Sequence, residues 1–161
     1  MTATLEPTRE ANGAAILVST PPSPPTKAEI EEVEGALLAL PQVAMPVTHV
    51  FAPGVYYREI FMPKGHFIIG HEHKTKHLNV VLSGRARVLI DGVVSELAAP
   101  AVFVSEAGVR KMLEITEDMR FATIHPTAGL EACGENIEQL EDALRTKSAT
   151  FLAHERKEIE P

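Results

Sequence analysis

The sequence contains no tryptophan and a single cysteine, and aromatic residues make up only 5% of its 161 residues. A core must therefore consist mainly of aliphatic side chains. Cys133 cannot form a disulfide within the chain, which favours a reducing compartment. No apolar run approaches the roughly 20 residues that span a bilayer, and the first ten residues carry acids without the basic cluster of a signal peptide. We therefore expect a cytoplasmic protein with no membrane partner.

Basic residues are also in deficit. The 15 lysines and arginines stand against 22 acidic residues, which gives a formal net charge of −7. A protein that binds nucleic acid needs a basic face to meet the phosphates, so nucleic acid is excluded as the main partner. The length fits one domain with some tail.

The N-terminal part divides into two segments. Residues 1–25 end in the proline-rich stretch STPPSPPT and are predicted to form a flexible arm. Residues 26–46 are predicted to contain a helix and a linker, because Thr26 and Glu29 have capping-box spacing and Pro41 ends the run. The helix either packs on the domain or contacts another subunit through its apolar positions, Ile30, Val33, Leu37 and Leu40.

Residues 47–126 have the pattern of an all-β domain, because short β-rich runs alternate with turn signals and no helical period interrupts them. This rhythm predicts a small antiparallel barrel, with turns at Pro63–Gly65, Ser83–Gly84, Asp91–Gly92 and Ala107–Gly108. Residues 127–161 are predicted to form a C-terminal helix and a tail. Ile137, Leu140 and Leu144 share one face of that helix, and the charged final residues are expected to fray.

Four of the seven histidines fall within residues 66–77. In an extended strand, side chains two apart point the same way, so His71, His73, His77 and Asn79 are predicted to share one face. Neutral imidazoles crowded together on an inward face would bind a divalent transition metal, namely Fe, Zn, Ni, Mn or Cu. The alternative is an exposed histidine-rich loop beside the basic stretch KTK.

The spacing Gly65-x5-His71-x-His73-x3-His77-x6-Gly84 resembles the first motif of the cupin superfamily, with His77 at the place of a glutamate. The second cupin motif keeps only Gly108; Pro100, Glu106, Lys111 and Ile115 stand at its glycine, proline, histidine and asparagine places. The chain looks most like the small single-domain cupins of phage and bacterial genomes. The resemblance implies a double-stranded β-helix, an RmlC-like jelly roll, that holds a metal inside the barrel. It also implies a homodimer or larger homo-oligomer, and a virion-associated location if the protein is phage-encoded.

Two further residues are candidates for catalysis. Lys111 stands at the place of the usual fourth ligand, where it would act as a base or hold a substrate carboxylate, unless it is a solvent-facing residue at a strand end. His125 shares a face with Phe121 and Thr123, so it is either an additional ligand, an acid–base group or a histidine of the core.

Three functional classes remain open at this stage: a metal-dependent oxidoreductase, isomerase or lyase; a non-catalytic cupin with a ligand or a structural metal; and a phage-type structural or accessory protein whose N-terminal arm docks on a partner. Three neutral imidazoles leave the charge of a metal uncompensated, which favours a small anionic molecule as the ligand. We therefore predict a metal-binding small cupin that binds or transforms such a molecule at a three-histidine site.

Overall fold

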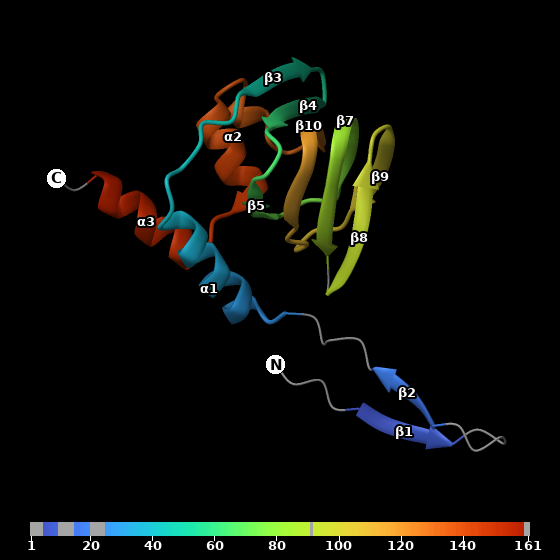
Figure 1. The fold of residues 1–161 in the computed structure, drawn as a ribbon. Helices are drawn as coiled ribbons and strands as arrows, with labels where there is room; N and C mark the ends of the chain where they lie inside the picture. Colours follow the sequence, from blue (N-terminus) through green and yellow to red (C-terminus); the bar gives the residue numbers. More distant parts are fainter. Residues whose placement is uncertain (1–4, 10–14, 20–24, 91, 160–161) are drawn as a thin grey trace.

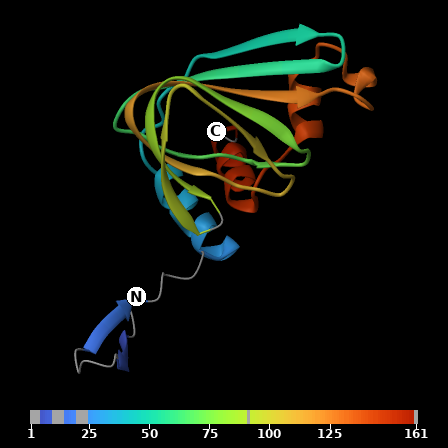
Figure 2. The ribbon, with the colours of Figure 1, turned by 90° about the vertical axis from the view of Figure 1, so that its right-hand side faces the viewer.

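Two long antiparallel strands, β7 (His77–Ile90) and β10 (Met112–Pro126), form the centre of the structure. The structure is a computed structural model that describes residues 5–9, 15–19, 25–90 and 92–159. Both strands are strongly curved, so that the sheet wraps around on itself (Figure 2).

The shorter strands pair with the two halves of this central strand pair, all in the antiparallel sense. At the half that contains the start of β7, β9 (Ala101–Ser105) pairs with β7, and β4 (Val55–Met62) pairs with β10 and with β3 (Val47–Ala52). At the other half, β8 (Val93–Ala98) pairs with β7 and β5 (Phe67–Ile69) with β10. The predicted small antiparallel barrel is therefore confirmed, as are the flanking helices (Figure 1).

The predicted turn at Ser83–Gly84 is wrong, because both residues lie inside β7 and mark a bend of the strand. Gly84 has φ of +86°, and a Cβ atom at this position would lie 2.2 Å from the carbonyl oxygen of Asp118 on β10. Only glycine permits this backbone conformation and this approach. The buried residues of β7 change from odd to even positions across the bend, and the register against β10 shifts nearby.

The inner face of the barrel is apolar over much of its length and polar near one end. The main core cluster consists of Met62, Val81, Ala86, Val88, Leu113, Ile115, Met119 and Phe121. Along β7 and β10 the same inward-facing rows continue into polar residues: Asn79 and His77 on β7, and Thr123 and His125 on β10. The barrel therefore encloses a buried polar region next to its hydrophobic core.

Helix α1 (Lys27–Leu38) begins at the predicted capping box, since the amide of Glu29 donates to Thr26 Oγ1 at 3.3 Å and the amide of Thr26 donates to the Glu29 carboxylate at 2.8 Å. Its predicted apolar face is only partly correct, because Val33 is 43% exposed and Leu40 is 58% exposed. The buried residue is Glu34, which can lie inward because it is paired and hydrogen-bonded. Its partners are the guanidinium of Arg110 and the hydroxyl of Ser148, which donates at 2.5 Å.

Helix α3 (Ala149–Ile159) lies beside α1 (Figure 1). It replaces the frayed tail that the charged sequence suggested. The hydroxyl of Ser148 accepts a hydrogen bond of 3.0 Å from the amide of Phe151, which satisfies a donor of the first turn, and Lys147 pairs with Glu155 at 3.0 Å. Local capping and this ion pair stabilise the first turns of the helix.

The chain between the barrel and α3 covers the polar end of the barrel. After a 3₁₀ turn at Glu131–Cys133, α2 (Ile137–Leu144) packs the predicted residues Leu140 and Leu144 against Tyr56 of β4. The next residues form a two-residue strand, β11 (Arg145–Thr146), which pairs with β6 (Glu72–His73).

Near the N-terminus, β1 (Leu5–Arg9) and β2 (Ala15–Ser19) form an antiparallel pair that the reading of residues 1–25 as a flexible arm did not include. The proline-rich residues 20–24 lie outside the described residues. Among the helices that the structure describes, none combines the length and the apolar character that a membrane crossing requires.

The close approach at Gly84 gives a test of the bend. Gly84→Ala should lower the free energy of unfolding by about 3 kcal/mol or more, because the added methyl group meets backbone atoms and the positive φ is unfavourable. Gly54→Ala is the matched control. Gly54 also has a positive φ (+78°), but there is open space around its Cβ position, so Gly54→Ala should lower the free energy of unfolding by only about 1 kcal/mol. If urea unfolding gives the same loss of unfolding free energy for both variants, the close approach of residue 84 to the Asp118 backbone does not matter for stability.

Candidate metal centre

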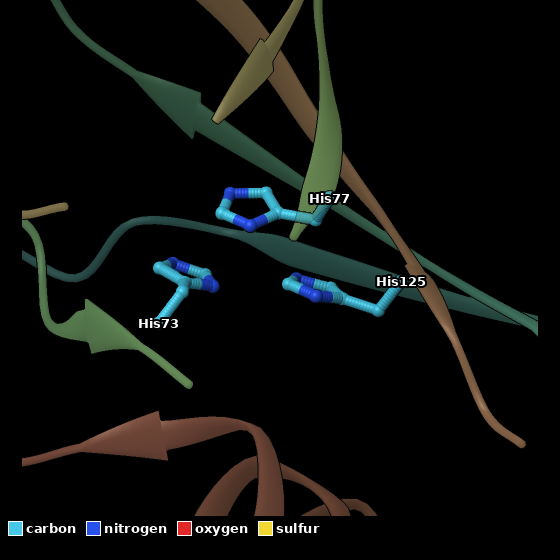
Figure 3. A group of neighbouring side chains, drawn as sticks. All are labelled: His73, His77 and His125. Atoms are coloured by element: carbon cyan, nitrogen blue, oxygen red, sulfur yellow. The ribbon is translucent and has the colours of Figure 1, made fainter. Parts of the chain in front are cut away.

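Three histidines from three strands meet inside the polar end of the barrel (Figure 3). His73 ends β6, His77 begins β7, and His125 lies near the end of β10. Each can offer one ring nitrogen such that these three atoms lie within 4.8 Å of one another. The ring centroids are 4.2 Å apart for His73 and His77, 5.0 Å for His73 and His125, and 4.6 Å for His77 and His125. We call these three residues the histidine cluster.

Strand geometry explains the position of two members of the cluster. His77 points inward together with Asn79 and Val81, and His125 points inward together with Thr123 and Phe121, as the period of two predicts. His77 and His125 are only 3% and 2% exposed, respectively. His73 reaches the same point from a different strand, because a bend at residues 74–75 separates β6 from β7.

The hydrogen bonds of the cluster leave ring nitrogens free to bind a metal. A carbonyl oxygen can only accept, so Nδ1 of His77 donates its hydrogen to the Thr75 carbonyl at 2.9 Å, and Nε2 carries the lone pair. That Nε2 atom is buried, and it has no hydrogen-bond partner among the described residues. The same holds for Nδ1 of His73 and of His125. Buried polar atoms without partners cost free energy, and bonds to a metal would remove this cost.

The surroundings keep the three rings neutral. Desolvation lowers the pKa of His73 to about 2 and that of His125 to about 3, and the other histidines and nearby cations contribute to both shifts. Desolvation also lowers the pKa of His77, while its hydrogen bond to Thr75 acts in the opposite direction. Neutral imidazole is the form that coordinates transition metals, so the electrostatics favour binding.

The donor set fits a transition metal rather than magnesium or calcium, because it consists of imidazole nitrogens and contains no carboxylate. Metal–nitrogen bonds of about 2.0–2.1 Å place tetrahedral ligands roughly 3.4 Å apart. The rings would therefore need to move together by about 1 Å, which rotation of the side chains can supply.

His71, which the sequence analysis grouped with the metal ligands, is not a member of the cluster. It precedes β6, and its ring packs edge-on against Phe151 of α3 with the centroids 4.6 Å apart. The parity rule holds only along one continuous strand, and the bend between β6 and β7 interrupts it. His125 takes the third position instead, which is one of the roles that the sequence left open for it.

A cavity of about 220 Å³ adjoins the cluster and is lined by His73 and His125. His71 also lines it; desolvation lowers the pKa of this histidine to about 4, and its Nδ1 has no hydrogen-bond partner in the described part of the chain. His71 therefore contributes to the wall of the cavity.

Lys111 lines the same cavity and is only 7% exposed, which excludes a solvent-facing position at the strand end. Desolvation lowers the pKa of its ammonium group to about 8. It forms no ion pair with any residue that the structure describes. A buried cation without a counter-charge favours an anion in the cavity.

The cavity is also lined by Arg58, Glu141 and Arg145, none of which the sequence indicated as site residues. Arg58 Nε donates to Glu141 at 2.9 Å, and Arg145 forms an ion pair with the same carboxylate. Arg145 and Glu141 lie beyond the barrel strands and belong to no motif, so no sequence signal indicated them. His49 and His66 do not line this cavity and have local contacts: His49 Nδ1 lies 2.7 Å from the hydroxyl of Tyr56, and His66 Nδ1 lies 3.1 Å from the Pro63 carbonyl.

The chain matches no protein-family model, and no curated protein matches it. Similar solved structures include an RmlC-like cupin family protein with a double-stranded β-helix fold from Methanocaldococcus jannaschii, with 13% identity over 55% of this chain and 86% of that one (TM-score 0.46). A cupin superfamily protein from Desulfitobacterium hafniense has 13% identity over 67% of this chain and 98% of that one (TM-score 0.46). Salicylate 1,2-dioxygenase from Pseudoaminobacter salicylatoxidans has 15% identity over 65% of this chain and 32% of that one (TM-score 0.49).

The antiparallel barrel that the resemblance of the first motif implies is present in the structure.

The histidine cluster predicts which residues hold the metal. His77→Gln and His125→Gln should each lower zinc or cobalt affinity by about a hundredfold or more, because each removes a ligand. His71→Gln should leave the metal affinity close to wild type, and His66→Gln is the control, because His66 is a half-buried histidine that does not belong to the histidine cluster. Metal content of tag-free protein and competition with a chelating dye provide the measurement. Loss of metal in His71→Gln with retention in His125→Gln would favour the ligand set predicted from the sequence.

The depressed histidine pKa values predict how stability depends on pH in the metal-free protein. Between the folded pKa values and about 6.5, the unfolded chain binds protons that the folded chain does not, so stability must fall as the pH falls through this range. Each fully titrating histidine contributes about 1.4 kcal/mol per pH unit. Urea unfolding from pH 7 to pH 4.5 should therefore show a smaller slope for His73→Gln/His125→Gln than for wild type. An unchanged slope in this variant would mean that the two rings are not held neutral.

Proposed function

We propose that this protein holds a divalent transition metal on His73, His77 and His125 and binds or transforms a small anionic molecule beside it. The observation that carries the proposal is the meeting of three imidazoles, those of buried His77 and His125 and of half-buried His73, each with a buried ring nitrogen that has no hydrogen-bond partner within the described residues. Three such nitrogens from separate strands are costly unless a common ligand satisfies them.

The charge balance supports an anion. Three neutral ligands leave the full charge of a divalent ion uncompensated, and Lys111 adds a second positive charge to the same cavity. An anion between them would neutralise both, in a region where the low dielectric constant strengthens the attraction.

When bound, a divalent metal would polarise an oxygen of the anion and lower the pKa of a coordinated water. The chain itself supplies three things. The apolar wall excludes bulk water, Lys111 orients the anion as a cation or accepts a proton in its neutral form, and the Thr75 carbonyl fixes the tautomer of His77.

The test uses Lys111→Met, which keeps the length of the side chain and removes its charge. Calorimetry with a panel of small carboxylates on the metal-loaded protein should show weaker binding by about tenfold, with metal content unchanged. Lys76→Met is the control, because Lys76 is an exposed lysine whose partner is Glu106 at 2.6 Å. Absence of anion binding to the metal-loaded wild type would refute the proposal and favour a scaffold role for the barrel.

A further inference from the structure

Arg145 reaches the cavity from outside the barrel. Its backbone pairs with His73 through the two short strands β6 and β11, so the side chain starts next to a member of the histidine cluster. The side chain is 16% exposed and lines the cavity, and its Nε atom is buried without a hydrogen-bond partner among the residues described. Arginine carries five N–H donors in a rigid fork, and at least one of them is unused here.

The counter-charge at Arg145 is incomplete. Glu141 pairs with Arg145 through one carboxylate oxygen and with Arg58 through the other, so one negative charge serves two guanidinium groups. Of the described residues that line the cavity, Glu141 is the only acidic one, whereas Arg58, Lys111 and Arg145 are all cationic. Glu141 therefore holds Arg145 in place without neutralising this end of the cavity.

The opposite part of the cavity wall is apolar. Met62, Leu113 and Phe121 line it, and all three belong to the main core cluster; Ile60 and Ile68 pack against that cluster and also line the cavity. The histidines adjoin the second core cluster instead, since Tyr56 stacks on His125 with the centroids 6.3 Å apart and Leu144 directly precedes Arg145. The cavity thus has a cationic end and an apolar end.

The cavity volume limits the size of an occupant. At roughly 30 Å³ for a water-sized group, a volume of about 220 Å³ accommodates about seven non-hydrogen atoms. Phosphate or sulfate would use only the cationic end. A carboxylate with a branched chain of four or five carbons would fill both ends.

We infer that the cavity binds a small monocarboxylate with an apolar body, and that Arg145 is the residue that recognises its carboxylate group. This inference rests on the proposed function, from which it takes the anion, and it adds the ligand class and a recognition residue from the C-terminal segment. The carboxylate lies between the Arg145 fork and the histidine cluster, and the apolar body lies against Met62 and Phe121.

The ligand class is tested by calorimetry on the metal-loaded full chain with acetate, propanoate, 2-methylpropanoate and 3-methylbutanoate. Affinity should rise about three- to fourfold with each added carbon, because each buries a further apolar group. If the affinity does not rise along this series, the assignment of an apolar end to the cavity is overturned. Tighter binding of inorganic phosphate or succinate than of 3-methylbutanoate would overturn the ligand class.

The role of Arg145 is tested with Arg145→Gln and Arg145→Lys. Arg145→Gln removes the charged fork and should weaken 3-methylbutanoate binding by about ten- to a hundredfold. Arg145→Lys keeps a charge without the fork, so its affinity should lie between those of Arg145→Gln and wild type. Binding of the uncharged analogue 3-methylbutan-1-ol, which has the same carbon skeleton, should be almost unchanged, whereas general damage to the cavity would weaken both ligands equally. Arg85→Gln is the control, because Arg85 is an exposed arginine that bonds Glu96 at 2.7 Å. Wild-type affinity in Arg145→Gln, or an equal loss for acid and alcohol, would overturn the assignment.

The same titrations on metal-stripped protein separate the two proposals. Carboxylate binding that depends on Arg145 without metal would uphold this inference even if the metal proposal failed. If the metal content is normal and the carboxylate affinity is the same in Arg145→Gln as in wild type, this inference alone is overturned. If Arg145→Gln does not fold, Arg145→Lys decides, because it retains the charge that pairs with Glu141 and should still bind 3-methylbutanoate at least threefold more weakly than wild type.

Discussion

Desolvation of the polar groups inside the barrel is the constraint on which the site depends. His77 and His125 lie on the same inward-facing rows of β7 and β10 as the hydrophobic core, and His73 reaches them from β6, so packing removes these rings from water. Burial makes the charged form of each ring unfavourable and leaves three ring nitrogens without hydrogen-bond partners among the described residues. These conditions are costly for isolated histidines and favourable for metal ligands, which is why the geometry and the electrostatics support the same function.

The C-terminal segment completes this environment. Leu140 and Leu144 of α2 pack on Tyr56, and the amide of Lys74 donates to the Leu144 carbonyl at 2.8 Å, so the helix covers the polar end of the barrel. Without this cover, His73 would be more exposed and its pKa less depressed. The same segment supplies Glu141 and Arg145, so one element both excludes solvent and sets the charge of the cavity.

A second buried polar group connects the remaining helices. Glu34 of α1 bonds Arg110, whose Nε donates to the Gly70 carbonyl at 2.9 Å, and it also bonds Ser148 at the start of α3. Gly70 directly precedes His71, and Arg110 directly precedes Lys111. The network therefore fixes the backbone next to two residues that line the cavity, His71 and Lys111, and links their position to the packing of α1 and α3.

The sequence alone determined the class of fold, the capped helix at Thr26 and the inward positions of His77, Asn79, Thr123 and His125. These features follow from local periodicity and local hydrogen bonding, which neighbouring residues settle among themselves. Tertiary structure decided which histidines meet: a bend between β6 and β7 and the pairing of distant strands brought His125 rather than His71 to His73 and His77. It also decided the continuation of β7 through Gly84, the inward position of Glu34 and the place of Arg145. Each of these depends on a contact with a residue far away in the chain, and such contacts leave no pattern in the spacing of nearby residues.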